Sequence, residues 1–498
     1  MPSRSDAAIW SGLFRISAES GQTLQAQIRQ AIVAAILDRQ IAPSMPLPSC
    51  RVLAEKLGVA RGTVVLAFQQ LVDQGFLIAR ERRGHFVNPE ILSSPQRPTD
   101  KVVAADSGEV DWLARRRIPS VEMPDAQQSE NWIKANYPFV YGQFDPALFP
   151  TAEWRECNRM ALAVLEIRRW AGDVVDRDDP LLIEQVQARL LPRRGIFANP
   201  DEIIVTLGAQ HALYMLATLL MGRGTKVAME DPGYPDARSI FRLSGAEVAP
   251  VPVDRDGIDP DAIPRDAGFV FVTPNHHCPT MVPLSEERRQ RLLADAEKYD
   301  RIIIEDGYDS QLVDDAPQQA LKSVDRSGRV VYVGSMSKTL APGLRIGYIV
   351  ADAGLIAELR ALRRFMLRHP PANNQRAVAL FLSLGHHEAL VRRLSAAFSE
   401  RRRRLVESVS AYLPEWQATQ APGGTSVWLQ GPVGADARQI AEDAARRGVV
   451  IEPGNRFFDR PENRTRFMRL GISSIALQQI EPGIRELALA AGRMRSAA

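Results

Sequence analysis

The residues best suited to chemistry stand at the ends of apolar, strand-like runs in the second half of the chain. Four short motifs have this position: Gly208-Ala-Gln, Asp231-Pro-Gly-Tyr, Asp306-Gly-Tyr and Ser335-Met-Ser-Lys. A lysine amine can form an imine with an aldehyde, a carboxylate can keep a ring nitrogen protonated, and hydroxyl groups with an arginine can bind phosphate. These are the groups that the cofactor pyridoxal 5'-phosphate (PLP) requires from a protein.

Each contact to PLP has a candidate residue in or beside these motifs. Lys338 would carry the imine-forming amine, and Asp306, at the end of an apolar strand, would hold the ring nitrogen. Tyr308 would contact the phenolic oxygen of the ring, and Tyr234 would stack on its face. The phosphate would meet backbone N–H groups at a helix start, two hydroxyls and a guanidinium. These phosphate contacts are assigned to Ala209, Gln210, Ser335, Ser337 and Arg345.

Alternating strand-like and helical segments would position these motifs. The alternation predicts an α/β domain with a mostly parallel central sheet. Ligands of such sheets bind at the carboxyl ends of the strands, so the motifs would converge on one site. The predicted strands are 202–206, 226–230, 247–251, 269–273, 301–305, 330–334 and 346–350.

A different pattern occupies the first ninety residues or so. Apolar residues recur at helical spacing over 24–37, and Ser49 can cap a short helix over 51–57 that ends at Gly58. A second helix is predicted over 61–74, followed by a strand, a turn at Arg83-Gly84 and a returning strand. Two short helices joined by a tight turn and followed by a hairpin predict a winged helix-turn-helix.

The predicted winged helix offers a basic surface to double-stranded operator DNA. The start of its second helix usually enters the major groove, and the wing meets phosphates or the minor groove. Segment 49–87 holds six Lys/Arg against three Asp/Glu, which is a local excess of positive charge. The predicted DNA contacts are Ser49, Arg51, Arg61, Thr63, Arg80, Arg82 and Arg83.

The length and composition fit two domains of an ordinary globular protein. The chain has 498 residues with 62 Lys/Arg against 59 Asp/Glu, so a nucleic-acid surface has to be local. We expect a winged helix at 12–88, a linker at 89–136 and a PLP-binding domain at 137–498. The chain shows no apolar signal core and no apolar run of eighteen residues, which predicts a cytoplasmic protein with no membrane segment.

Two other kinds of site are disfavoured. The three cysteines lie far apart without a CxxC pair, which argues against a disulfide framework and a zinc finger. His276-His277-Cys278 does not predict a metal site, because adjacent residues on an extended segment point in opposite directions. Ser335-Met-Ser-Lys also fits the S-x-x-K motif of serine acyl-enzymes, but the companion motifs S-D-N and K-T-G are absent.

Both halves resemble known families. The run from Leu47 to Val64 resembles the GntR-family signature LPSxRxLAxxLGVSRxTV, and the run from Ser335 to Tyr348 resembles SxSKxLAPGLRxGY, the lysine segment of fold-type-I aminotransferases. Gly208-Ala-Gln and Glu230-Asp-Pro-Gly-Tyr-Pro match earlier motifs of that second family in the right order. Together the chain resembles the MocR group of GntR-family regulators over about 20–88 and 137–495.

The resemblance implies a role for each PLP candidate and adds one residue. Lys338 would be the Schiff-base lysine, and Arg469 would hold the carboxylate of an effector. The chain departs from the family pattern at Ala60, where a serine is common, and at the turn that usually reads Asn-Pro-Thr-Gly. Here Cys278 stands in place of the asparagine and Met281 in place of the glycine. Weaker ring contacts are compatible with a sensor that turns over poorly.

The resemblance implies a dimeric transcription regulator that binds PLP as a Schiff base and senses an amino compound through external aldimine formation. The alternative is an active PLP-dependent aminotransferase that carries a DNA-binding domain. A third possibility is a sensor of PLP itself without an amine ligand. We favour the regulator, with residual aminotransferase activity left open, because the two domains are fused.

Overall fold

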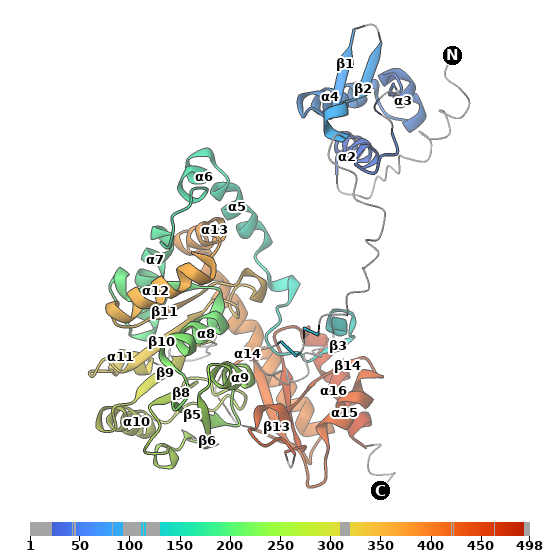
Figure 1. Cartoon of the computed structure of the whole chain (residues 1–498). Coiled ribbons are helices and arrows are strands. Elements are labelled where there is room, and N and C mark those ends of the chain that lie inside the picture. Colours follow the sequence, from blue (N-terminus) through green and yellow to red (C-terminus); the bar gives the residue numbers. More distant parts are fainter. Residues whose placement is uncertain are drawn as a thin grey trace. The chain divides into compact units, whose positions relative to one another are not determined.

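The computed structural model describes residues 22–41, 43, 46–81, 83–92, 111–112, 114–115, 130–308, 319–419, 421, 423–462 and 464–492. The chain divides into two compact units, Met1–Arg115 and Arg116–Ala498, with the division inside the predicted linker. Figure 1 shows the elements of each unit. Residues 12–21, most of the predicted linker and Arg82, one of the predicted DNA contacts, lie outside the described residues.

The first unit is the predicted winged helix. It consists of α2 (Leu24–Leu37), α3 (Cys50–Leu57), α4 (Arg61–Asp73) and the antiparallel hairpin β1 (Leu77–Arg80) and β2 (Gly84–Val87). Ser49 caps α3 by accepting a hydrogen bond from the Val52 N–H at 3.3 Å, and Gly58 ends that helix in the left-handed conformation. Both end signals were correctly predicted.

One apolar core holds this unit together. The buried faces of α2 and α4 meet at Ile28, Ile32, Val64 and Phe68, whose side chains are at most 1% exposed. The spacing of these residues places them on one face of each helix. Leu53 of α3 and Leu77 of the wing join the same core, so packing fixes the position of α4 relative to the wing.

The second unit contains an eight-stranded sheet in the order β4-β11-β10-β9-β8-β5-β6-β7. The β10-β9-β8-β5-β6 stretch is parallel, whereas β11 runs antiparallel to both its neighbours and β7 antiparallel to β6. The mostly parallel sheet was correctly predicted, and all seven predicted strands are present. Their bounds are β4 (Ile203–Thr206), β5 (Lys226–Asp231), β6 (Glu247–Asp254), β7 (Gly257–Ile258), β8 (Phe269–Val272), β9 (Ile302–Asp306), β10 (Val330–Ser335) and β11 (Gly347–Val350).

Helices cover both faces of this sheet (Figure 1). On β9, Ile304 packs in the core beneath α8 (Gly208–Leu220), α9 (Pro235–Leu243) and α12 (Ala353–Leu367). The adjacent Ile303 points the opposite way, into the core beneath α10 (Glu286–Lys298) and α11 (Leu321–Val324). Strands buried on both faces read as continuous apolar runs, which is why the sequence pattern was clear.

A smaller subdomain carries a second sheet in the order β12-β13-β16-β15. The strands are β12 (Gln417–Ala418), β13 (Ser426–Gln430), β15 (Glu452–Pro453) and β16 (Phe467–Gly471), and they pack with α14 (His386–Tyr412), α15 (Ala437–Ala445) and α16 (Leu477–Gly492). Beside them, β3 (Tyr137–Pro138) pairs in parallel with β14 (Val449–Val450).

The remaining elements connect and cover these sheets. The further helices are α5 (Thr151–Ala161), α6 (Val164–Trp170), α7 (Pro180–Gln185), the π-helical η4 (Val186–Leu190) and α13 (Ala372–Ser383). Single 3-10 turns are η1 (Pro89–Leu92), η2 (Glu130–Lys134), η3 (Pro146–Leu148), η5 (Pro192–Arg194), η6 (Pro200–Glu202), η7 (Pro260–Ala262), η8 (Pro342–Leu344) and η9 (Gly454–Phe457). Within the described ranges, no helix has the length and apolar character needed to cross a membrane.

Candidate cofactor-binding site

One cavity of about 260 Å³ lies at the carboxyl ends of the parallel strands in the second unit. All ten residues predicted to contact the cofactor or the effector carboxylate line it, although they are spread over 260 positions of the sequence. These residues are Ala209, Gln210, Tyr234, Asp306, Tyr308, Ser335, Ser337, Lys338, Arg345 and Arg469.

Lys338 lies in the loop that follows β10. Its Nζ is 4.2 Å from the centre of the Tyr141 ring. The backbone of Gly142 passes so close to the amine that a Cβ there would collide with Nζ, and its φ of +81° is the left-handed value that glycine adopts readily. The amine therefore lies between the Tyr141 ring and the Gly142 backbone at one wall of the cavity.

Asp306 ends β9 and is 4% exposed. Burial raises the pKa of its carboxyl from 3.8 to about 7, while the Lys338 ammonium and the Tyr308 backbone N–H act in the opposite direction. Among the described residues, no group donates a hydrogen bond to its Oδ1. A buried carboxylate oxygen without a donor is suited to a protonated ring nitrogen.

Two tyrosines flank this carboxyl. The Tyr308 hydroxyl donates to the His276 carbonyl at 2.9 Å, and the Tyr234 hydroxyl donates to Asp236 at 3.2 Å. Gln210 donates to the same Asp236 carboxylate. Asp236 thus fixes both Tyr234 and the side chain of Gln210, which leaves the backbone at the start of α8 facing the cavity.

Ala209 and Gln210 at the start of α8 line the cavity together with Ser335, Ser337 and Arg345, and this part of the cavity is called the phosphate recess below. Gly208 has a φ of +78°, and a Cβ there would stand 2.9 Å from Nη2 of Arg345. That same Nη2 donates to the Leu207 carbonyl at 2.9 Å, which orients the guanidinium toward the helix start. Ser335 lies at the end of β10, where its hydroxyl accepts from the Ser337 N–H at 3.2 Å. These groups match the donors that bind a phosphate.

The turn that departs from the aminotransferase pattern places a thiol, not an amide, in the cavity. Cys278 lines the cavity and is 5% exposed, and burial raises the pKa of its thiol to about 12. Asn275 points elsewhere and accepts from Arg289 at 2.6 Å. Met281 adopts a φ of +66°, a conformation that suits the glycine usually found there and strains a larger residue.

A second buried carboxyl, that of Glu230, lies near Asp306, and the charge of Asp306 contributes to raising the pKa of Glu230. Glu230 accepts from the Thr273 N–H at 3.1 Å and from its hydroxyl at 2.7 Å, and the Thr273 hydroxyl accepts from the Cys278 N–H at 3.0 Å. Burial raises the pKa of Glu230 to about 8 and lowers the pKa of His277 to about 3. The 3.7 Å approach of His277 to Glu230 is therefore not an ion pair at neutral pH.

Arg469 of β16 is buried and already engaged. Its Nε and Nη2 donate to one oxygen of Glu452 at 2.7 and 2.6 Å, and its Nη1 lies 3.8 Å from the sulfur of Cys278. The centre of the Tyr141 ring is 3.8 Å from its Cζ. The other oxygen of Glu452 approaches Arg456 at 3.4 Å.

Sequence reasoning missed several residues of this cavity. Tyr141 and Gly142 precede the first predicted strand, and Glu452 and Arg456 lie in short elements whose pairing is set by distant residues. The acidic residue that follows Tyr234-Pro was the one available signal, since Asp236 stands in the first turn of α9. The other missed residues are Gln143, Pro235, Thr273 and Phe457.

The predicted DNA contacts lie at the start of α3, in the first turn of α4 and on the wing. Arg51, Arg61, Arg80 and Arg83 are exposed, and Thr63 is half-buried in the first turn of α4. The Arg80 guanidinium lies 4.8 Å from the centre of the Phe86 ring, which braces the wing. Ala60 provides no side-chain cap for α4, and its carbonyl accepts from the Thr63 N–H at 3.0 Å.

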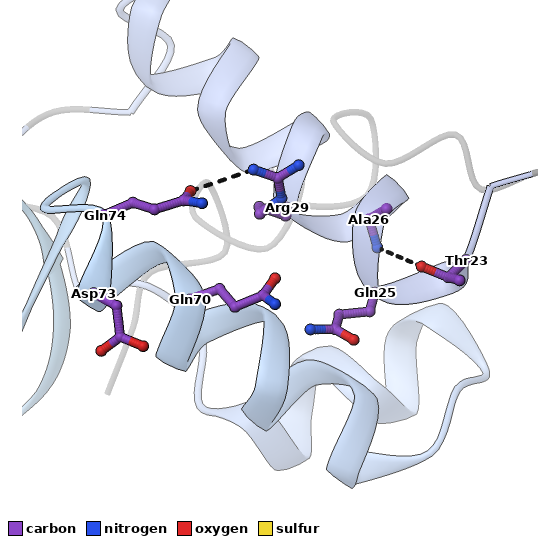
Figure 2. A pocket seen from close by; sticks show the side chains of 7 residues that line it. All are labelled: Thr23, Gln25, Ala26, Arg29, Gln70, Asp73 and Gln74. Carbon is purple, nitrogen blue, oxygen red and sulfur yellow. Dashed lines mark hydrogen bonds between the residues drawn. The ribbon is translucent and has the colours of Figure 1, made fainter. Parts of the chain in front are cut away.

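The first unit also has a hollow between α2 and α4, of about 390 Å³ (Figure 2). Arg29 donates to Gln74 across it at 3.3 Å, and the other walls are Thr23, Gln25, Ala26, Gln70 and Asp73. This hollow is open to solvent, and none of the ten residues predicted to contact the cofactor or the effector carboxylate lines it. We therefore place the small-molecule site at Lys338.

Comparison with known proteins finds a different family in each of the two units. The model of bacterial regulatory proteins of the gntR family matches residues 24–87, and the model of aminotransferase class I and II matches residues 173–486. The transcriptional regulator TauR of Rhodobacter capsulatus is 44% identical over 477 residues, which cover 95% of this chain and 98% of TauR. The probable rhizopine catabolism regulatory protein MocR of Rhizobium meliloti is 29% identical and covers 93% and 92%. The chain belongs to the MocR group of GntR-family transcription regulators.

Solved structures resemble the second unit of this MocR-group chain. A kynurenine aminotransferase from Pyrococcus horikoshii is 26% identical with a TM-score of 0.67, covering 72% of this chain and 90% of its own. An archaeal alanine:glyoxylate aminotransferase is 28% identical with a TM-score of 0.67, covering 71% and 90%. The MocR-group chain therefore joins a DNA-binding winged helix to a PLP-binding fold of the fold-type-I aminotransferases.

Proposed function

We propose that this chain is a transcription regulator whose DNA binding responds to an amino compound recognised at PLP on Lys338. The observation that carries the proposal is the cavity in which four features come together: Lys338, the Asp306 oxygen that has no hydrogen-bond partner among the described residues, the phosphate recess and Arg469. The same chain carries a GntR winged helix. A cofactor site fused to a DNA reader links ligand chemistry to gene control when the two states of the site differ in affinity for the ligand.

The residues of the cavity would divide the work as follows. PLP, when bound, supplies an aldehyde carbon that condenses with primary amines and a ring that withdraws electron density. Lys338 would hold the aldehyde carbon, Asp306 would keep the ring nitrogen protonated, and Tyr308 would contact the phenolic oxygen. Tyr234 would cover the ring. The phosphate would be bound by the Ala209 and Gln210 N–H groups, Ser335, Ser337 and Arg345, and Arg469 would receive an anionic group of the effector.

The winged helix would read an operator through α4 and the wing. Arg61 and Thr63 stand in the first turn of α4, the part of a recognition helix that reaches base edges. We assign phosphate or groove contacts to Ser49, Arg51, Arg80, Arg82 and Arg83. We keep 12–88, 89–136 and 137–498 as the proposed boundaries of the winged helix, the linker and the PLP-binding domain.

We also propose that the regulator is a homodimer. A single winged helix reads one half-site, and paired half-sites require two readers related by symmetry. Sedimentation equilibrium of the full chain tests this directly. A mass near twice 55.2 kDa supports the proposal, and a mass near 55.2 kDa over the whole concentration range overturns it.

An active aminotransferase is the second candidate, because Lys338, Asp306 and Arg469 share one cavity. The visible absorbance of the PLP-loaded chain, followed as amino acids and amines are added, separates the candidates. A stable change of the cofactor band, together with altered affinity for DNA selected from a random duplex pool, supports a sensor. Steady release of a keto acid identifies an aminotransferase.

Lys338→Ala is the matched variant. We expect it to lose the spectral response and the effect of the amino compound on DNA affinity while basal DNA binding survives. Loss of all DNA affinity in a folded Lys338→Ala protein would contradict a modular sensor. A wild-type chain that shows no cofactor band with added PLP would overturn the whole proposal.

A further inference from the structure

The Arg469 guanidinium is held by a carboxylate of the chain itself. Glu452 and Arg469 face each other across the antiparallel pair β15–β16, so their side chains leave the same face of the sheet side by side. The Glu452 oxygen accepts at 2.6 and 2.7 Å, and the two residues are 8% and 4% exposed. An anion that arrives at Arg469 therefore finds its charge already compensated.

The other neighbours of Arg469 are poor partners for its charge. Nη1 lies 3.8 Å from the sulfur of Cys278, and a thiol is a weak acceptor. The rings of Tyr141 and Phe457 lie 3.8 and 4.6 Å from Cζ. If an anion bound at Nη1 while Glu452 stayed in place, two carboxylates would share one guanidinium in a buried cavity, which like-charge repulsion disfavours.

A second arginine, Arg456, lies where it could form an ion pair with Glu452 in place of Arg469. Nη1 of Arg456 is 3.4 Å from the other Glu452 oxygen, longer than the usual 2.9 Å of a hydrogen bond. Its Nε is buried and has no hydrogen-bond partner among the described residues. A Glu452 that moved toward Arg456 would stay compensated and would free the edge of Arg469 that it now occupies.

The charge count favours this exchange. Without a ligand the group holds two guanidinium ions and one carboxylate, and a ligand with one negative charge brings it to neutrality. An uncharged ligand end cannot replace a carboxylate on a buried arginine, since that would leave Glu452 without its strongest partner. Glu452 would thus disfavour the binding at Arg469 of amines that lack an anionic group. It would not act on the reaction of the amine at Lys338.

We propose that Glu452 determines which effectors bind. In the empty cavity the Glu452 carboxylate occupies the anion site on Arg469. When an effector with a carboxylate or similar oxyanion binds, Glu452 moves to Arg456 and the effector takes its place on Arg469. The inference rests on the proposed function in one respect, namely that Arg469 receives the anionic end of the effector. The inference predicts that the effectors are amino compounds that also carry an oxyanion. It also gives Glu452 and Arg456 roles that no sequence motif indicates.

The test uses ligands without an amine, so that it does not depend on chemistry at Lys338. Propanoate and propanamide are titrated against the full-length PLP-loaded chain by saturation-transfer-difference NMR. We expect Glu452→Gln to bind propanoate at least about tenfold more tightly than wild type, about 1.4 kcal/mol, with propanamide unchanged. Glu407→Gln, which breaks an exposed 3.0 Å pair with Arg403 on α14, is the control and should match wild type.

Equal or weaker binding of propanoate by folded Glu452→Gln would overturn the proposal, because it would mean that Glu452 orients Arg469 and does not compete for it. A crystal structure of the wild-type chain with propanoate gives the second test without a variant. We expect Glu452 on Arg456 and propanoate on the freed edge of Arg469. Glu452 still on Arg469 beside bound propanoate would refute the exchange. Failure of the sensor proposal appears separately, as an absent response to amino compounds while propanoate binding follows these expectations.

Discussion

Replacement of Asp306 by asparagine should stabilise the cofactor-free chain and weaken its hold on PLP. The two effects have one cause. Asp306 is 4% exposed at the end of β9, and its Oδ1 has no donor among the described residues. The folded cofactor-free chain therefore bears the cost of a buried carboxylate, whereas a protonated ring nitrogen would compensate that charge.

The size of the effect follows from the pKa. Burial raises the pKa of Asp306 from 3.8 to about 7. When the pKa of a carboxyl rises on folding, the folded state is fully stable below the unfolded pKa, where the group is protonated in both states. This stability is lost as the pH rises through the folded pKa, and the loss is the cost of the buried carboxylate. At about 1.36 kcal/mol per unit, the cost of Asp306 is on the order of 4 kcal/mol at pH 8 and roughly 2 kcal/mol at pH 5. The difference in free energy of unfolding between Asp306→Asn and wild type should therefore widen by roughly 2 to 3 kcal/mol over this range.

Urea unfolding of the cofactor-free chain at pH 5 and pH 8, followed by tryptophan fluorescence, measures this difference. The exposed Asp201→Asn serves as the control and should show no widening. Dialysis of the PLP-loaded proteins measures the second effect, and Asp306→Asn should lose the cofactor faster than wild type. If Asp306→Asn is not more stable than wild type at pH 8, or if the difference is the same at both pH values, the reasoning about the buried carboxylate is wrong.

Three further predictions concern the phosphate recess and the winged helix. Gly208→Ala places a Cβ 2.9 Å from Nη2 of Arg345 in a left-handed backbone, so PLP affinity, measured by absorbance titration, should fall while the fold is kept. Arg61→Ala should weaken DNA binding by about 1–3 kcal/mol and relax the base preference at one operator position, measured by selection from a random duplex pool, with the cofactor spectrum unchanged; an unaltered base preference would place Arg61 away from the base edges. Ser49→Ala removes the cap of α3 and should destabilise the winged helix by about 1 kcal/mol in a urea titration, whereas Ser49→Asp should not.

The parts of this structure that local chemistry determines could be predicted from the sequence. Gly58 and Ser49 mark the ends of α3 because caps are encoded within a few residues. The strands of the large sheet were found because both of their faces are buried, as the opposite orientations of Ile303 and Ile304 show. The motifs at their carboxyl ends then share a site by topology alone.

Residues placed by long-range pairing could not be predicted in the same way. Glu452 faces Arg469 because β15 pairs with β16, two short strands separated in sequence by a 3-10 turn and a loop. A strand of two residues, as β15 is, gives no periodic signal. Motif reasoning assigned Arg469 to the effector carboxylate but had no means of showing that Glu452 already occupies it.

The altered turn shows the same limit at a single position. The sequence indicated that Cys278 replaces an asparagine and Met281 a glycine, but not how the backbone would respond. The structure keeps the left-handed conformation at Met281 and turns the nearby Asn275 toward Arg289. Cys278 therefore gives this wall of the cavity a thiol, and Met281 adopts a left-handed backbone conformation although it carries a side chain.

Tyr141 joins the cofactor site to the start of the second unit. This ring touches both the Lys338 amine and the Arg469 guanidinium, yet it stands only five residues after Asn136, the last residue of the predicted linker. Between them, β3 is fastened to β14 by parallel pairing. The charges of Lys338 and Arg469 both act on this one side chain, which stands in the turn three residues after β3. Lys338 and Arg469 thus both lie against a ring that stands five residues after the predicted linker, the segment of chain that leads to the winged helix.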